Sequence, residues 1–304
     1  MTDYSSYLKN AGLTPDEIKK VENMRTGDKN NKKGSFYEKS FTIYQMLKYT
    51  NQALEDKKNI LEQNHIIFSN CNIATVDDLC ISLESENKHF NYQLKNSSTT
   101  GRWNRELEEN FQIQKKLDAF DKKNSYQTLV CSDKGIVEQN KQEMNQADGF
   151  NSIYYPSHGT RAEMLNDEET ELKSLLKVVC LDVTQYETAL RLIDAVQGES
   201  IDFKKTLGDW WKRVIESSKP NIFLFYSDNE LKKQIRDDVI KHLESREFIL
   251  NDGAIVYKQQ FSIVITDSFL KKLKEESISR KVLACGTSRE LLGLLQELST
   301  VDLM

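Results

Sequence analysis

The stretch TVDDLCISLESENKHFNYQLKNSS, residues 75–98, contains two segments in which apolar side chains occupy every second position. This alternation is typical of β-strands that bury one face. It predicts one strand over residues 77–85 and another over residues 89–95. The ENK triplet between them is short enough for a hairpin turn, so we expect the two strands to pair in antiparallel orientation.

Polar side chains stand at the open end of this expected hairpin. Asp77 and Asp78 begin the first strand, and Gln93 and Lys95 end the second. Gln93 and Lys95 share one face of their strand because they are two residues apart. In an antiparallel pair, the start of one strand lies beside the end of the other. A carboxylate, an amide and an ammonium group are therefore expected to converge at one edge of a sheet.

Helices and further strands are expected on both sides of the hairpin. The pattern before it predicts a well-buried helix over residues 35–54, which carries Glu38, and a strand over residues 65–69. After it we expect a helix over residues 102–123 and a strand over residues 126–132. Glu38 is therefore the candidate acid on a helix upstream of the hairpin.

Phosphodiester hydrolysis is the chemistry that uses this set of groups. A carboxylate and a neighbouring oxygen ligand can hold Mg²⁺, which prefers hard oxygen donors and keeps several waters. A lysine can orient the attacking water or stabilise the developing charge. Each group also has a structural explanation: Asp77 and Asp78 as a strand-entry turn, Gln93 and Lys95 as a solvated strand face, and Glu38 as a surface helix residue.

Three segments, GSFYEKSFTIYQMLK, VDDLCISLE and YQLKNSS, resemble the PD-(D/E)xK nuclease superfamily. More narrowly, they resemble the double-stranded DNA endonuclease domains of bacterial anti-phage effectors in CBASS and Lamassu systems. The resemblance covers about residues 30–145. It implies an α/β fold with a restriction-endonuclease-like mixed sheet flanked by helices, followed by a mainly helical C-terminal domain.

The same resemblance implies a role for each matching residue. Asp78 or Asp77 would be the main metal carboxylate, Gln93 the second metal ligand, and Lys95 the catalytic lysine. Glu38 would be the helix acid that completes the metal shell. Gln93 stands where the superfamily more often has an acid, an exchange that Mrr-type restriction nucleases share. A neutral amide binds metal less tightly than a carboxylate, so a degenerate, inactive site stays an open alternative.

The implied function is Mg²⁺-dependent cleavage of double-stranded DNA, with Mn²⁺ as an alternative ion. The protein would be an antiviral defence effector, held inactive by a partner or by its oligomeric state until infection, and a homo-oligomer when active. A Lamassu-like effector held by an SMC-like ATPase is favoured over a CBASS-like one, because residues 165–304 match no cyclic-oligonucleotide sensor. The alternatives are a non-catalytic binding or scaffold subunit on a degenerate nuclease fold, and an RNA-cleaving effector.

Basic residues suggest where DNA would bind. Lys32 and Lys33 lie in a polar stretch, residues 26–34, whose simpler interpretation is a solvated loop. Arg102 follows soon after the candidate lysine and could reach a phosphate. The alternative interpretation of that segment is a helix that begins with Thr100 as its N-cap.

Length and composition limit the remaining possibilities. A chain of 304 residues predicts two domains, a nuclease domain over residues 1–150 and a regulatory or partner-binding domain over residues 165–304, with a boundary within residues 145–169. The net charge of −5 argues against a protein that coats nucleic acid by charge alone. The widely spaced cysteines and histidines predict neither a disulfide framework nor a zinc site. Without a run of 18 apolar residues or a signal-peptide pattern, a cytoplasmic protein with no membrane contact is expected.

Overall fold

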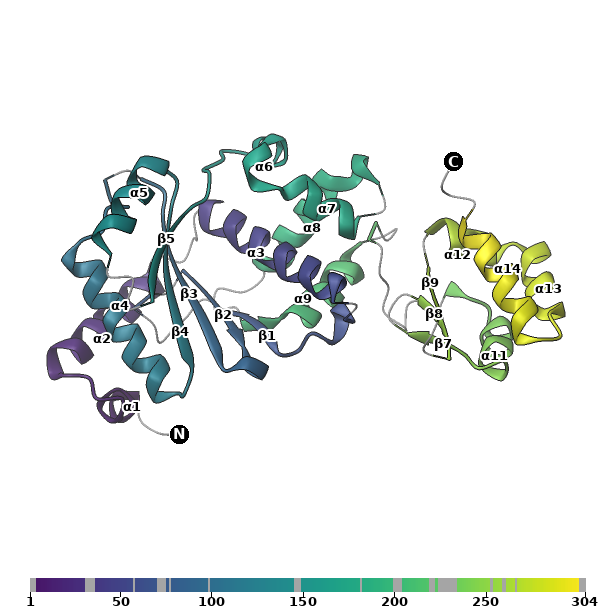
Figure 1. The fold of residues 1–304 in the computed structure, drawn as a ribbon, viewed down its shortest axis with the longest axis horizontal. Coiled ribbons are helices and arrows are strands. Elements are labelled where there is room, and N and C mark those ends of the chain that lie inside the picture. The colour runs from purple at the N-terminus through teal and green to yellow at the C-terminus, as the bar shows by residue number, and fades with distance from the viewer. Residues whose placement is uncertain are drawn as a thin grey trace.

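The computed structural model shows a mixed α/β fold (Figure 1). It describes residues 4–30, 36–56, 58–69, 75–76, 78–97, 99–144, 149–180, 182–198, 204–218, 222–223, 234–251, 254–258, 261–265 and 267–300. Lys32, Lys33 and Asp77 lie outside the described residues, so their expected roles stay predictions. None of the helices in the described part of the chain combines the length and apolar character that crossing a lipid bilayer requires.

The larger sheet of the described residues has six strands in the order β5-β4-β3-β2-β1-β6. Strands β1, β2 and β3 form an antiparallel meander, β4 and β5 run parallel to β3, and β6 pairs with β1 in antiparallel orientation. Their bounds are Ile66–Ser69 for β1, Leu79–Leu83 for β2, Lys88–Lys95 for β3, Asn124–Cys131 for β4, Phe150–Tyr154 for β5 and Lys204–Thr206 for β6.

The expected hairpin is present as β2 and β3, paired with Leu79 opposite Tyr92. The turn is a short 3-10 helix, η2 (Glu84–Glu86), followed by Asn87 with a φ of 52°. Asn tolerates this left-handed conformation better than most residues because its short polar side chain can hydrogen-bond locally. The turn therefore closes without the glycine that tight hairpins usually need.

Helices cover both faces of this sheet (Figure 1). Helix α3 (Phe36–Glu55) packs against the face formed by Tyr92 and Leu94, and the helix expected over residues 35–54 is well buried. On the opposite face, α4 (Arg105–Phe120) and α5 (Lys134–Glu143) enclose a second cluster of buried side chains. Helices α1 (Tyr4–Asn10) and α2 (Pro15–Asn30) pack against α4. Since α2 continues to Asn30, the first part of the expected loop over residues 26–34 is helical.

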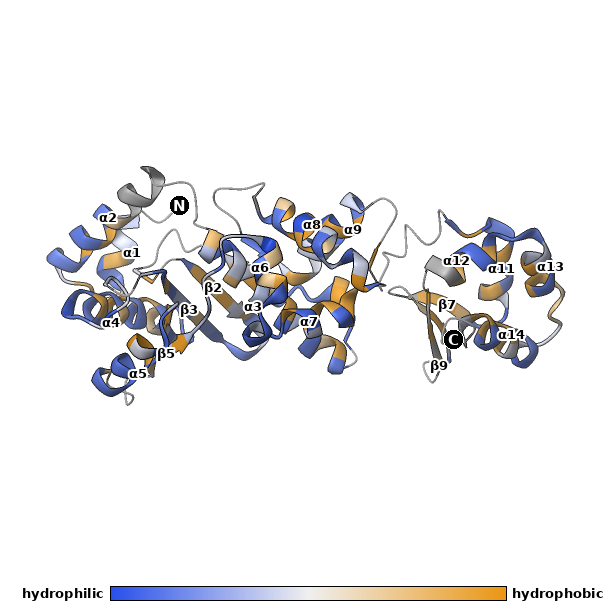
Figure 2. Cartoon of the chain, turned by 90° about the horizontal axis from the view of Figure 1, so that it is seen from above, coloured by the Kyte–Doolittle hydropathy of each residue, from blue (hydrophilic) through white to orange (hydrophobic). Residues whose placement is uncertain are grey.

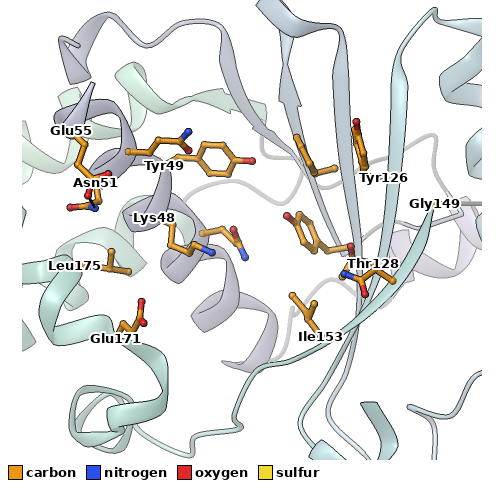
Figure 3. A pocket seen from close by; sticks show the side chains of 15 residues that line it. Lys48, Tyr49, Asn51, Glu55, Tyr126, Thr128, Gly149, Ile153, Glu171 and Leu175 are labelled. Carbon is orange, nitrogen blue, oxygen red and sulfur yellow. Dashed lines mark hydrogen bonds between the residues drawn. The ribbon is translucent and has the colours of Figure 1, made fainter. Parts of the chain in front are cut away.

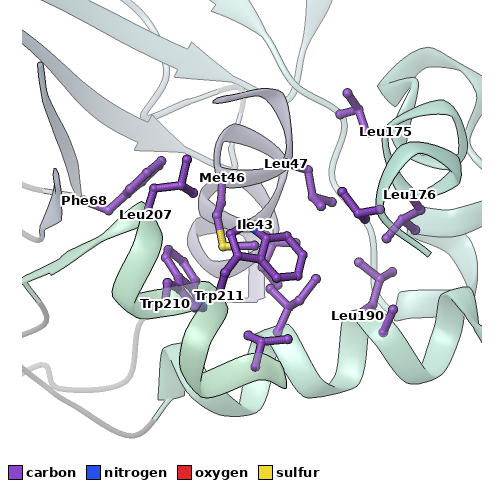
Figure 4. Close-up of a cluster of buried hydrophobic side chains, with 14 of the residues drawn as sticks. Ile43, Met46, Leu47, Phe68, Leu175, Leu176, Leu190, Leu207, Trp210 and Trp211 are labelled. Carbon is purple, nitrogen blue, oxygen red and sulfur yellow. The ribbon is translucent and has the colours of Figure 1, made fainter. Parts of the chain in front are cut away.

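The hydrophobic cores divide the chain at a different place from the predicted boundary. Four helices beyond residue 160 join the core that α3 begins: α6 (Arg161–Asn166), α7 (Leu172–Val179), α8 (Tyr186–Gly198) and α9 (Leu207–Ser217). Trp210 and Trp211 of α9 are fully buried in this core (Figure 4). The indole N–H of Trp211 donates a 2.8 Å hydrogen bond to the hydroxyl of Thr50. Residues 161–223 thus complete the first core rather than begin a second domain.

A second, smaller core involves residues 235–298. Its elements are α11 (Asp237–Ser245), β7 (Phe248–Asn251), β8 (Ala254–Tyr257), β9 (Phe261–Val264), α12 (Asp267–Lys274), α13 (Glu276–Ala284) and α14 (Ser288–Thr300). The three strands form an antiparallel sheet. Leu291, Leu295 and Leu298 of α14 are buried in this core. These helices carry both hydrophobic and hydrophilic residues, as amphipathic helices do (Figure 2). The chain therefore ends in a mainly helical unit, as expected, but a shorter one with its own sheet.

Candidate active site

The register of β2 and β3 brings Asp78 next to the end of β3. Leu79 pairs with Tyr92, so the preceding residue, Asp78, lies beside Gln93. One carboxylate oxygen of Asp78, Oδ2, accepts two hydrogen bonds: 2.5 Å from Nε2 of Gln93 and 2.6 Å from the backbone N–H of Leu94. The amide and the carboxylate that were expected to meet are in direct contact.

Two further charged groups act on the Asp78 carboxylate. Glu38 stands in the first turn of α3, and its negative charge raises the pKa of Asp78. Lys95 is the last residue of β3, and its positive charge lowers that pKa. Charges influence each other's ionisation in this way only at short range. The structure thus shows Asp78 in contact with Gln93, with Glu38 and Lys95 near enough to act on the ionisation of Asp78.

Together these effects favour the neutral, protonated form of Asp78. Burial is the largest cause, and with the repulsion from Glu38 it raises the pKa of Asp78 from 3.8 to about 7. The hydrogen bonds from Leu94 and Gln93 and the charge of Lys95 only partly oppose this rise. A bound cation would reduce the repulsion between the negative charges of Asp78 and Glu38.

Asp78, Glu38 and Gln93 are the residues that would hold a Mg²⁺ ion. Asp78 and Glu38 offer carboxylate oxygens, and Mg²⁺ commonly binds through one or two carboxylates while it keeps several waters. Gln93 turns its nitrogen toward Asp78, so its amide must rotate to offer the oxygen to a metal. Within the described ranges, no group of three or more His, Cys, Asp and Glu side chains is placed to hold a metal ion. The candidate site has two such ligands and one amide.

The segment that follows β3 carries Arg102, whose side chain is exposed. Asn104 is the N-cap of α4, because its side chain accepts a hydrogen bond from the N–H of Leu107. The alternative that Thr100 caps this helix is therefore wrong. Arg102 is thus placed outside the helix, on the segment that joins Lys95 to α4, where a phosphate could reach it.

Asn140 of α5 holds this segment in place, a role that nothing in the sequence indicated. Its side chain is 1% exposed, accepts a 2.8 Å hydrogen bond from the N–H of Trp103 and donates one of 2.8 Å to the carbonyl of Gly101. A Cβ on Gly101 would lie 2.9 Å from the carbonyl oxygen of Ser97 and 3.2 Å from the sulfur of Cys131. The close packing explains the glycine at position 101.

A buried polar network near the other end of β3 also escaped prediction. The Asp118 carboxylate of α4 is 2% exposed and is hydrogen-bonded to His89, Asn91, Gln114 and Ser125. A buried carboxylate is tolerated when donors surround it. Because two of these partners belong to β3, the network fixes this strand, which also carries Gln93 and Lys95, against α4.

No family model matches this chain, and comparison with curated proteins and with solved structures found no match either. The geometry of the site and the order of the elements around it are therefore the basis for assigning a function.

Proposed function

We propose that this chain is a metal-dependent endonuclease that cleaves double-stranded DNA. The observation that carries the proposal is the contact between Asp78 and Gln93 where the hairpin of β2 and β3 opens, with Glu38 and Lys95 near enough to act on the charge of Asp78. These groups supply oxygen ligands for a divalent ion and a cation for a phosphate. A carboxyl group that the fold makes harder to ionise is typical of functional sites, which favours a functional role for this cluster.

The order of the elements supports the finer description of the fold as restriction-endonuclease-like. A helix with an acid in its first turn precedes three antiparallel strands, and a further helix then leads to a strand parallel to the third. This arrangement agrees with what the resemblance of residues 30–145 implies. It places the candidate lysine, Lys95, at the carboxyl end of a central strand.

The residues of the site have separable roles in this proposal. Asp78 and Glu38 would hold Mg²⁺ or Mn²⁺, with the oxygen of Gln93 as a further ligand after its amide rotates. Such an ion would supply an activated water and neutralise charge on the phosphate. Asp78 would hold the ion in its ionised form, and Lys95 would stabilise the negative charge that develops on the scissile phosphate.

The biological role that we propose is that of an effector in bacterial anti-phage defence. A nuclease that cuts double-stranded DNA would damage its own cell, so it must be silent before infection. We propose that a partner, of the SMC-like ATPase type found in Lamassu systems, or the oligomeric state of the chain provides this control. The separate core over residues 235–298 offers a unit that could bind such a partner without disturbing the site.

Cleavage of supercoiled plasmid in the presence of Mg²⁺ or Mn²⁺ tests the activity. The wild-type chain is compared with Lys95→Ala and with Lys88→Ala, a matched control at the opposite end of the same strand. We expect the wild type and Lys88→Ala to cut, and Lys95→Ala to be at least about 100-fold slower. Equal cutting by all three proteins would show that the site has no role. Cleavage of RNA but not DNA would favour the RNA-cleaving alternative.

A silenced nuclease would not cut in this assay, so a second measurement is independent of activity. Expression of the wild type without its partners should be toxic to a bacterial host, and Lys95→Ala should remove the toxicity. Binding of Mn²⁺, measured by calorimetry, should occur in the wild type and in Lys95→Ala but not in Asp78→Asn. A chain that neither binds Mn²⁺ nor causes toxicity would be a scaffold on a degenerate fold, and the proposal would fail.

A further inference from the structure

A cavity of about 700 Å³ lies between α3 and the strands β3, β4 and β5 (Figure 3). Its volume is within the range of small-molecule sites. It is on the face of the sheet that carries Phe90 and Tyr92, whereas Gln93 and Lys95 alternate with these residues along β3. The cavity is therefore distinct from the candidate active site, although one strand contributes to both.

Several polar side chains in the wall of the cavity have no hydrogen-bond partner among the residues that the structure describes. The Gln45 side chain is 5% exposed, and the structure gives its amide no hydrogen bond to any described residue. The hydroxyls of Tyr49 and Tyr92 line the same cavity, also without a hydrogen bond to the described part of the chain. Burial raises the pKa of Tyr49 to about 12, so its hydroxyl is neutral and can donate a hydrogen bond at physiological pH. These polar groups line the cavity, where a ligand can exchange hydrogen bonds with them.

Two stacked aromatic rings form another part of the cavity wall. Phe90 and Tyr126 are opposite one another in the parallel pairing of β3 and β4. Their rings are stacked, with centroids 4.9 Å apart and an interplanar angle of 14°. Tyr126 remains 41% exposed, so part of its ring is accessible. A flat ring of the ligand can extend this stack, as bases do on aromatic side chains.

The charges around the cavity indicate an uncharged ligand. Two acids, Glu55 and Glu171, line it together with a single described cation, Lys48 (Figure 3). Glu55 accepts a hydrogen bond from Asn51, another lining residue. A phosphate group would meet a net negative surface here, whereas a neutral ring with hydrogen-bonding edges would not.

We propose that this cavity binds an uncharged nucleoside. The base stacks on Tyr126, and its polar edge exchanges hydrogen bonds with the Gln45 amide and the hydroxyls of Tyr49 and Tyr92. An amide side chain suits this role because it offers a donor and an acceptor in one plane, as the edge of a base does. The ligand is a free small molecule, and its binding does not depend on the proposed nuclease activity.

Calorimetric titration of the full chain with adenosine, guanosine, cytidine and uridine tests the proposal. At least one nucleoside should bind with a Kd below about 1 mM, and its 5′-monophosphate should bind more weakly. Tyr126→Ala should weaken binding about tenfold or more, because one base–aromatic stack is lost. Gln45→Leu replaces the amide by an apolar side chain of similar size and should also weaken binding.

The matched control is Phe120→Ala, which removes an aromatic ring of equal exposure, 42%, that does not line the cavity. Its affinity should equal that of the wild type. Folding of each variant is checked by tryptophan fluorescence, since Trp210 and Trp211 lie in the core that packs against α3. Absence of binding by all four nucleosides, equal binding by Tyr126→Ala and the wild type, or binding of monosaccharides in their place would overturn the proposal.

Discussion

Replacement of Asp78 by asparagine should stabilise the protein at alkaline pH when no divalent ion is present. The fold raises the pKa of this carboxyl group from 3.8 to about 7, chiefly through burial and the nearby charge of Glu38. A carboxyl group with a raised pKa favours the folded state while it is protonated, and this contribution is lost as the pH rises through the folded pKa. An amide at this position carries no charge at any pH. Its oxygen could still accept the hydrogen bonds from Gln93 and Leu94.

The size of the effect follows from the pKa values. A rise from 3.8 to about 7 corresponds to roughly 4 kcal/mol in the free energy of unfolding, since one pKa unit is worth about 1.4 kcal/mol. Solvent reaches part of the Asp78 side chain and screens its interactions. We therefore expect Asp78→Asn to be more stable than the wild type by about 2–4 kcal/mol at pH 8. The difference should be small near pH 4 and should grow with pH until it levels off above pH 7.

Urea unfolding monitored by tryptophan fluorescence measures this difference. All three tryptophans of the chain lie within residues 103–211, so the signal reports on the core that contains the site. Asp209→Asn, an exchange at an exposed carboxylate in the first turn of α9, is the control and should change stability little at any pH. If Asp78→Asn is less stable than the wild type at pH 8, ionised Asp78 stabilises the fold and the reasoning is refuted.

Three further predictions concern the site and the packing around it. Binding of Mg²⁺ should release about one proton at pH 6 and none at pH 8.5, because Asp78 must ionise to bind the ion. Calorimetry in buffers of different ionisation enthalpy measures the number of protons released. A release that does not change with pH would contradict the prediction. Gln93→Glu should tighten Mn²⁺ binding about tenfold or more in the same calorimeter, and an unchanged affinity would remove Gln93 from the ligand set. Gly208→Ala should cost about 2 kcal/mol or more in urea unfolding, because its Cβ would lie 2.5 Å from the carbonyl oxygen of Leu61. Gly293 lies on an exposed part of α14, where an added Cβ would meet nothing within 4 Å. Gly293→Ala should therefore increase the free energy of unfolding by about 1 kcal/mol. Destabilisation by both substitutions would contradict the steric argument.

The elements near the candidate site could be predicted because their signals are local. Alternation of apolar residues located β2 and β3, and the two-residue period put Gln93 and Lys95 on one face. The short connection then required Asp78 to lie near Gln93, a contact that the structure contains. What the sequence did not reveal is that the amide directs its nitrogen, rather than its oxygen, toward the carboxylate.

Elements that depend on distant partners were missed. Strand β5, Phe150–Tyr154, lies in a stretch rich in Asn, Gly and Ser that suggested a domain boundary, and it is a strand because β4 provides a parallel edge. Helices α7 and α9 have apolar faces that show they are buried, but an apolar face does not identify its partner. Their partner is α3, more than 100 residues earlier, so the first core extends to Phe223. Asn140 and the network around Asp118 depend on the same kind of long-range contact.

The long separation between α3 and α9 has a consequence for synthesis on the ribosome. Every residue of the candidate site is translated by position 95, whereas the tryptophans that cover the apolar side of α3 arrive more than 100 residues later. The nascent chain lacks the hydrogen bond from Trp211 to Thr50, and the buried contacts of both tryptophans, until α9 has been made. The side of α3 that these tryptophans cover therefore stays uncovered until translation has passed residue 211.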